Sequence, residues 1–143
     1  MAKILVADDD ADMRQMLNIH IRKAGHTVLL AENGQAAVEM AEAESPQLIL
    51  IDLQMPVMDG IEAIEHIRRT TDSAKLPIIL LSAETDKKKW VESLAAGAND
   101  FVLKPYHKSE LLARIKTHLA VADLTEGMAN MTRKLAEKKR ILE

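Results

Sequence analysis

A run of four apolar residues, Leu48 to Ile51, leads directly into Asp52, and Pro56 follows shortly afterwards. An unbroken apolar run of this length is typical of a strand that is buried on both faces, as in a parallel sheet. Asp52 then falls at the carboxyl end of the strand, the edge at which open α/β sheets bind their ligands. Because a single aspartate after a strand more often serves a turn or a helix cap, the other strand ends must decide its role.

Strand-like and helix-like segments alternate along the chain. Short apolar segments have the composition of buried strands at residues 4–7, 27–31, 48–52, 78–83 and 101–105. Apolar residues recur at helical spacing in segments 13–24, 36–41, 61–67, 86–96 and 111–119. This alternation predicts right-handed βαβ units and a doubly wound parallel sheet with helices on both faces. We therefore predict an α/β fold with five helices and five parallel strands in the flavodoxin-like order 2-1-3-4-5.

Composition narrows the classes of function. The 143 residues suit one domain, and the lack of cysteine excludes disulfides, thiolate metal sites and cysteine nucleophiles. A net charge of −3 and only three aromatic residues argue against a nucleic-acid-binding surface. No apolar run approaches the roughly 18 residues of a membrane span, and Met1 leads straight into a strand pattern without a signal peptide. We expect a cytoplasmic domain that binds neither membranes nor nucleic acid directly.

Acidic residues follow the first and third predicted strands. These strands are neighbours in the order 2-1-3-4-5, so Asp8, Asp9 and Asp52 should meet at one edge of the sheet. Crowded carboxylates repel one another, which raises the pKa of at least one of them unless a cation lies among them. A hard divalent cation with oxygen ligands relieves the repulsion, and Mg²⁺ fits best. Asp10 and Asp12 are interpreted as capping residues of the following helix.

A hydroxyl and an ammonium group end the remaining strands of this edge. Ser82 closes the fourth strand and Lys104 the fifth. Lysine supplies a compact positive charge for a phosphate oxygen, and serine donates a hydrogen bond to another. Taken singly, Ser82 is an ordinary strand-end cap and Lys104 an ordinary surface lysine. Together with Asp52 and a metal, they are the groups that phosphoryl transfer onto a carboxylate requires.

These motifs resemble the receiver domain of two-component response regulators. The matching segments occur in the family's order and spacing at residues 4–10, 52–60, 81–83 and 96–105. The resemblance implies that Asp52 accepts a phosphoryl group from a histidine kinase or phosphotransfer protein, and that the domain is otherwise no enzyme. It implies Mg²⁺ as the cofactor, held by Asp52 and Asp9, by Asp8 through water, and by the backbone carbonyl of Gln54.

The resemblance also implies a conformational switch. Ser82 and Lys104 would hold the phosphoryl oxygens, and Phe101 would swing inward as Ser82 is drawn to the phosphate. The surface of the fourth helix, fifth strand and fifth helix would then change. The family carries a cis peptide bond between Lys104 and the following proline. In this family, the positions of Gln54 and Glu84 tune the lifetime of the phosphoryl group.

A heptad pattern continues beyond the receiver-like segment. Its positions, spaced alternately by three and four, are Val121, Leu124, Met128, Met131, Leu135, Lys138 and Leu142. We therefore divide the chain into a receiver domain, 1–120, and a helical extension, 121–143, that forms a homodimeric coiled coil and leads to an output domain. Gly127 weakens the pattern, and a solvated amphipathic tail is the alternative. Because the pattern runs to the last residue, we expect the chain to be part of a longer protein.

Two other functions remain open from the sequence. One is a stand-alone receiver that acts only by binding a partner protein. The other is a Mg²⁺-dependent phosphatase that uses Asp52 as a transient nucleophile. The haloacid-dehalogenase-like enzymes place a second acid two residues beyond the nucleophile, where this chain has Gln54, which disfavours them. Lysines 87–89 beside Trp90 are interpreted as a solvated helix face, with partner docking as the alternative.

Overall fold

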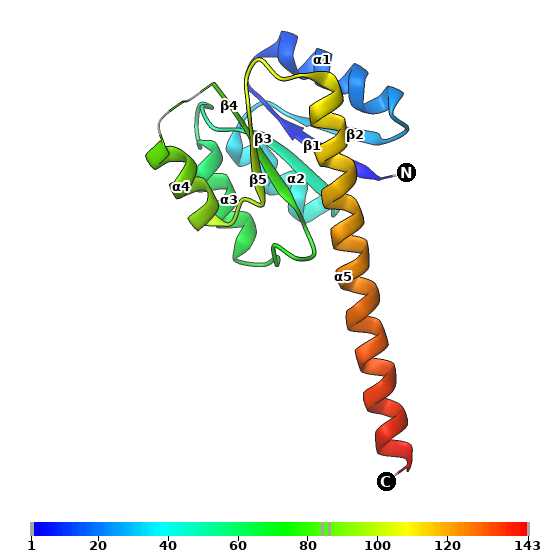
Figure 1. The fold of residues 1–143 in the computed structure, drawn as a ribbon. Helices are drawn as coiled ribbons and strands as arrows, with labels where there is room; N and C mark the ends of the chain where they lie inside the picture. Colours follow the sequence, from blue (N-terminus) through cyan, green and yellow to red (C-terminus); the bar gives the residue numbers. More distant parts are fainter. Residues whose placement is uncertain (1, 84, 86, 143) are drawn as a thin grey trace.

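Five parallel strands alternate with five helices in the residues that the structure, a computed structural model, describes: 2–83, 85 and 87–142 (Figure 1). The elements are β1 (Lys3–Ala7), α1 (Ala11–Lys23), β2 (Thr27–Ala31), α2 (Gly34–Glu44), β3 (Leu48–Asp52), α3 (Gly60–Arg68), β4 (Ile78–Ser82), α4 (Lys87–Ala96), β5 (Asp100–Leu103) and α5 (Lys108–Leu142). The strand order is β2-β1-β3-β4-β5, and each neighbouring pair is parallel. The predicted doubly wound fold and its strand order are confirmed.

Two apolar clusters cover the opposite faces of the sheet. Helices α1 and α5 cover one face with Leu17, Ile21, Leu111 and Ile115. Helices α2 and α3 cover the other face with Ala37, Ala63, Ile64 and Ile67. Successive side chains of a strand point to opposite faces, so a strand with helices on both sides needs apolar residues throughout. All five residues of β3 are buried, which explains the unbroken run before Asp52.

Short polar side chains begin the first three helices. The caps are Asp10 for α1, Asn33 for α2 and Asp59 for α3. The carboxylate of Asp10 accepts hydrogen bonds from the backbone N–H groups of Asp12 and Met13, which satisfies donors that have no partner within the helix. Asp10 is therefore the cap, whereas Asp12 lies in the first turn of α1 and favours the helix through its dipole.

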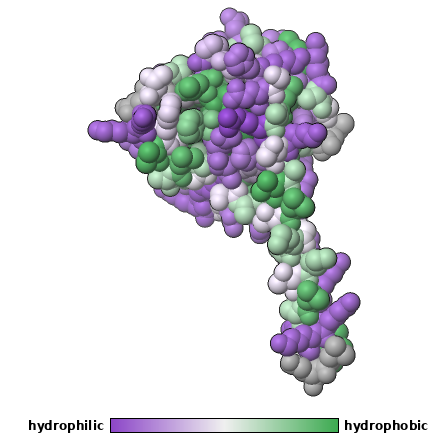
Figure 2. Space-filling view, in the orientation of Figure 1, coloured by the Kyte–Doolittle hydropathy of each residue, from purple (hydrophilic) through white to green (hydrophobic). Residues whose placement is uncertain are grey.

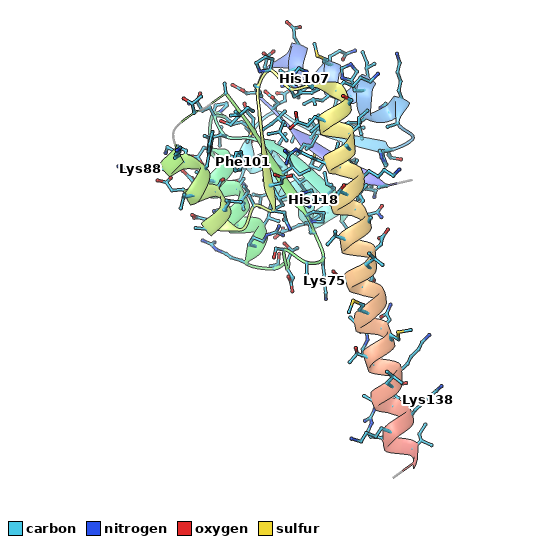
Figure 3. The ribbon with its side chains drawn as sticks, in the orientation of Figure 1. Lys75, Lys88, Phe101, His107, His118 and Lys138 are labelled. Carbon is cyan, nitrogen blue, oxygen red and sulfur yellow. The ribbon has the colours of Figure 1, made fainter. Side chains whose placement is uncertain are left out.

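Helix α5 is a single element of 35 residues, about 50 Å long at 1.5 Å per residue. Its first part packs on the sheet, and the remainder projects away from the domain (Figure 1). His118 lies where the helix still follows the domain, and Lys138 lies far out on the projecting part (Figure 3). The helix continues without a break across residues 120 and 121. Despite its length, neither α5 nor any other helix of the described residues is apolar enough to cross a membrane.

The first residue of α3 presses against the end of β3. A Cβ atom added at Gly60 would lie 2.3 Å from the carbonyl oxygen of Asp52, far inside contact distance. The N–H of Gly60 donates a hydrogen bond of 2.8 Å to the carbonyl oxygen of Leu53. Glycine is therefore required where α3 begins, and this close approach holds the backbone at the carboxyl end of β3.

We predict that Gly60→Ala lowers the free energy of unfolding by about 1–3 kcal/mol, because the added methyl group must displace the backbone of Asp52. Gly127→Ala is the matched control, since nothing lies within 4 Å of its added Cβ. Alanine in that helical position should stabilise by up to about 1 kcal/mol. Urea unfolding of both variants measures the two effects, and an unchanged stability of Gly60→Ala would contradict the close contact.

Candidate functional site

Three carboxylates meet at the carboxyl edge of the sheet. Asp8 and Asp9 follow β1, and Asp52 ends the neighbouring strand β3. One carboxylate oxygen from each lies within 4.8 Å of the others, and no other group of three or more acidic or histidine residues meets this criterion in the described part of the chain. Asp8 and Asp52 are buried, at 1% and 8% exposure, whereas Asp9 is exposed. The predicted convergence of these residues is confirmed.

Lys104 provides the positive charge beside these carboxylates. Its Nζ lies 2.9 Å from Oδ2 of Asp8 and 3.3 Å from Oδ2 of Asp52. The other oxygen of Asp8 accepts a hydrogen bond from the backbone N–H of Asp10. Strand β5 ends one residue before Lys104, but the Lys104 N–H still donates to the carbonyl oxygen of Ser82. The peptide bond that follows Lys104 is cis, as the resemblance implied.

An open cavity of about 340 Å³ unites these groups with Ser82 and Gln54. Its lining consists of Asp8, Asp9, Asp10, Asp52, Gln54, Ser82, Ala83 and Lys104. Ser82 is the last residue of β4 and is buried, while Gln54 lies on the exposed loop after β3. The structure therefore brings together the predicted site residues other than Phe101. Glu84 lies outside the described residues.

The acidity of Asp52 reflects its surroundings. The pKa of Asp52 is raised from 3.8 to about 6: burial is the largest cause, the charges of Asp8 and Asp9 also raise it, and Lys104 opposes them. Burial by itself would lower the pKa of Lys104, but Asp8 and Asp52 together raise it above its ordinary value. Repulsion between carboxylates was the cause expected from the sequence, and desolvation is the larger one.

Phe101 lies outside the cavity, on the side of β5 toward α4 (Figure 3). Its ring stacks on that of Trp90, with centroids 4.8 Å apart and an angle of 24° between the planes. From the sequence, Trp90 was considered only as part of a docking surface, whereas it is half-buried in this stack. Its spacing of three and six residues from Ser93 and Ala96, which also face the core, is the helical signal that could have placed it there. Lysines 87–89 are exposed, as predicted.

The fold and the acidic edge of the sheet together are those of a receiver domain. Residues 4–116 match the response regulator receiver domain family, to which the chain therefore belongs. The acidic cluster is typical of the family's phosphoacceptor site. A receiver domain is not a classical enzyme, so the phosphatase alternative is rejected.

Relatives and solved structures agree with this assignment. The chain is 38% identical over 127 residues to the response regulator MprA of Mycobacterium ulcerans, covering 89% of this chain and 54% of MprA. It is 33% identical over 129 residues to the alkaline phosphatase synthesis transcriptional regulatory protein PhoP of Bacillus subtilis, covering 90% and 53%. The chain thus spans about half the length of the curated relatives it matches.

Among solved structures, the chemotaxis protein CheY4 of Vibrio cholerae superposes with a TM-score of 0.77 at 33% identity, over 82% of this chain and 98% of CheY4. The receiver domain of the Francisella response regulator 1452 also superposes with a TM-score of 0.77, at 29% identity over 84% and 98% of the two chains. Both comparisons extend over nearly the whole of the other chain. The receiver fold therefore accounts for most of this chain.

The raised pKa of Asp52 predicts a pH-dependent stability difference. Since its folded pKa, about 6, exceeds the ordinary value of 3.8, ionisation of Asp52 opposes folding. Without divalent cations, Asp52→Asn should be more stable than the wild type above about pH 6, and this advantage should vanish below about pH 4, where Asp52 is protonated in both states. Urea unfolding in the presence of a chelator measures the difference at each pH.

Asp10→Asn is the control for this experiment, because asparagine caps a helix as well as aspartate does. It should follow the pH profile of the wild type. A stability difference between Asp52→Asn and the wild type that stays constant from about pH 4 to about pH 7 would show that ionisation of Asp52 does not oppose folding.

Proposed function

We propose that Asp52 accepts a phosphoryl group from a histidine kinase or phosphotransfer protein in a Mg²⁺-dependent reaction, and that the domain then signals to an output domain or partner. The observation that supports this most is the contact of Lys104 with Asp52 in a cavity that also holds Asp8, Asp9 and Ser82. A carboxylate nucleophile, a cation and a hydroxyl donor thus surround one space. These are the groups that a transferred phosphoryl group requires.

The donor set fits Mg²⁺. Three carboxylates and one ammonium leave an excess of two negative charges, which a divalent cation would neutralise. Asp8, Asp9 and Asp52 supply the hard oxygen ligands that Mg²⁺ prefers, and the exposed loop at Gln54 offers a backbone carbonyl beside them. When bound, Mg²⁺ supplies neutralisation of the phosphoryl oxygens' charge.

The transfer itself needs little further chemistry from the protein. A carboxylate oxygen of Asp52 attacks the phosphorus of the donor's phosphohistidine, and an O–P bond forms as the P–N bond breaks. The electron pair of that bond stays on the imidazole nitrogen of the donor. Lys104, 3.3 Å from Asp52, then binds a phosphoryl oxygen, and the hydroxyl of Ser82 donates to another. Phe101 swings inward as Ser82 moves.

We predict that Asp52→Asn abolishes phosphoryl uptake, because the amide that replaces the carboxylate is not a nucleophile. Incubation with acetyl phosphate and Mg²⁺, followed by intact-mass measurement, should detect one added phosphoryl group on the wild type and none on the variant. Asp10 lines the same cavity, and the variant Asp10→Asn should still take up the phosphoryl group. Full labelling of Asp52→Asn would refute the assignment of the acceptor.

We propose further that residues 1–120 form the receiver and that residues 121–143 form a linker that pairs with a second copy. The apolar seam of the extension is exposed by more than half of each side chain at Val121, Leu124, Met128, Met131 and Leu135. Figure 2 shows apolar side chains along this projecting helix. A second helix covering the seam would bury these residues at coiled-coil spacing.

The phase of the seam allows this pairing. Projected back along α5 at heptad spacing, the seam passes through Thr117, Arg114 and Glu110. Glu110 and Thr117 are exposed, whereas Arg114 is partly buried and its guanidinium pairs with Asp100 of β5 at 2.8 Å. A partner helix can therefore lie along the projecting part of α5, from Val121 onward, without displacing the core. Because the curated relatives are about twice as long, we propose that the linker leads to an output domain.

The dimer predicts a specific response to substitution. Leu135→Lys would place two positive charges in the seam and remove roughly 2 kcal/mol of apolar burial per helix. The dissociation constant of the dimer should therefore rise by well over tenfold. Ala129→Lys, on the outer face of the same helix, should not weaken it. Analytical ultracentrifugation with and without Mg²⁺ and beryllofluoride measures both. A wild-type protein that is monomeric under all conditions would contradict the coiled coil.

A further inference from the structure

Helix α4 has a weak hold on the sheet. Ser93 is its one fully buried residue among those described, and the apolar side chains of Val91 and Leu94 are 65% and 46% exposed. Ala96 packs against the core at the far end of the helix. Trp90 is therefore the large side chain with which α4 contacts the sheet, and its contact is the ring of Phe101.

The two ends of α4 are held differently. Just beyond its carboxyl end, the guanidinium of Arg68 in α3 donates to the carbonyl oxygen of Gly97 and to the side-chain oxygen of Asn99, at 2.9 and 2.8 Å. These hydrogen bonds do not involve Asp52 or its cavity. In the first half of the helix, the described contact with the sheet is the stack of Trp90 on Phe101. The carboxyl end of α4 is thus held by hydrogen bonds from Arg68, whereas its first half is held by the stack of Trp90 on Phe101.

The pairing of β5 with β4 connects Phe101 to the proposed phosphate-binding edge of the sheet. It pairs with Leu80 of β4, and Leu103 pairs with Ser82. Side chains two residues apart on a strand point to the same face, so Phe101 and Ser82 share the face that α4 covers. A displacement of Ser82 toward the cavity therefore opens space on the side of the sheet where Phe101 and Trp90 lie.

We propose that Trp90 is a positioning residue that couples the Asp52 site to helix α4. This inference rests on the proposed switching of Phe101. When the Phe101 ring turns inward, it leaves the indole of Trp90, and the first half of α4 loses its large apolar contact. The helix then pivots about the end held by Arg68. Phosphorylation thereby alters the surface that Val91, Leu94 and lysines 87–89 present.

Tryptophan fluorescence can follow the separation of Trp90 from Phe101 directly, because Trp90 is the only tryptophan in the sequence. With Mg²⁺ and beryllofluoride, the emission of Trp90 in the 143-residue chain should shift. Hydrogen exchange of the amides in the first half of α4 should accelerate under the same conditions. Phe101→Leu should abolish the shift in emission. An emission spectrum of the wild type that does not respond to beryllofluoride would overturn the proposal.

Two variants distinguish a role of Trp90 in transmitting the change at Asp52 from a purely structural role in packing α4. In Trp90→Leu, the exchange of the α4 amides should be fast with and without beryllofluoride, so that the response is lost. In Val91→Ala, which alters an exposed neighbour on the same helix, the response should match that of the wild type. A full response of α4 in Trp90→Leu would also overturn the proposal.

Phosphoryl uptake from acetyl phosphate is measured by intact mass on the same samples. It distinguishes failure of the coupling role of Trp90 from failure of the proposed phosphoacceptor role of Asp52. Uptake by the wild type together with an unresponsive α4 would refute the role of Trp90 alone. Absence of uptake by the wild type would refute the proposed function of Asp52. Retained uptake in Trp90→Leu, with loss of the α4 response, is the result expected of a residue that transmits the signal without taking part in the transfer.

Discussion

The ammonium group of Lys104 lies between the carboxylates of Asp8 and Asp52, and much of the structure serves to place these three groups. Each stands at or just beyond the carboxyl end of a different parallel strand. Two carboxylates so deeply buried would repel each other strongly without a cation between them. The sheet therefore has to bring β5 alongside β4 for the acidic edge to be stable, which makes the order of the strands an electrostatic requirement as well as a packing solution.

In the proposed switch, phosphorylation at the edge of the sheet changes the surface of the domain. Ser82 ends β4, and its neighbours on β5 lead to Phe101 and from there to α4. A helix that was packed by many large side chains would resist such a signal, because close-packed interfaces do not deform continuously. Helix α4 instead rests on small residues and one ring stack. Its weak attachment is what makes it suited to respond.

Helix α5 combines two different environments in one element. Its first part is an ordinary amphipathic helix that buries Leu111 and Ile115 against the sheet. Its remainder carries an apolar seam that the domain itself cannot cover, since that part projects beyond it (Figure 1). The heptad spacing predicted the helix and its exposed seam, because both follow from local periodicity. Local periodicity alone does not identify what covers the seam.

Local patterns in the sequence were enough to predict the five strands and the polar residues that follow four of them, because an apolar run and the residue that closes it are local properties of the chain. Parallel order then predicted that Asp8, Asp9 and Asp52 meet. The packing of the elements against one another was needed to reveal that burial is the main cause of the raised pKa of Asp52, and that Trp90 stacks on Phe101. Those outcomes depend on distances and desolvation among elements far apart in the chain, which no single segment encodes.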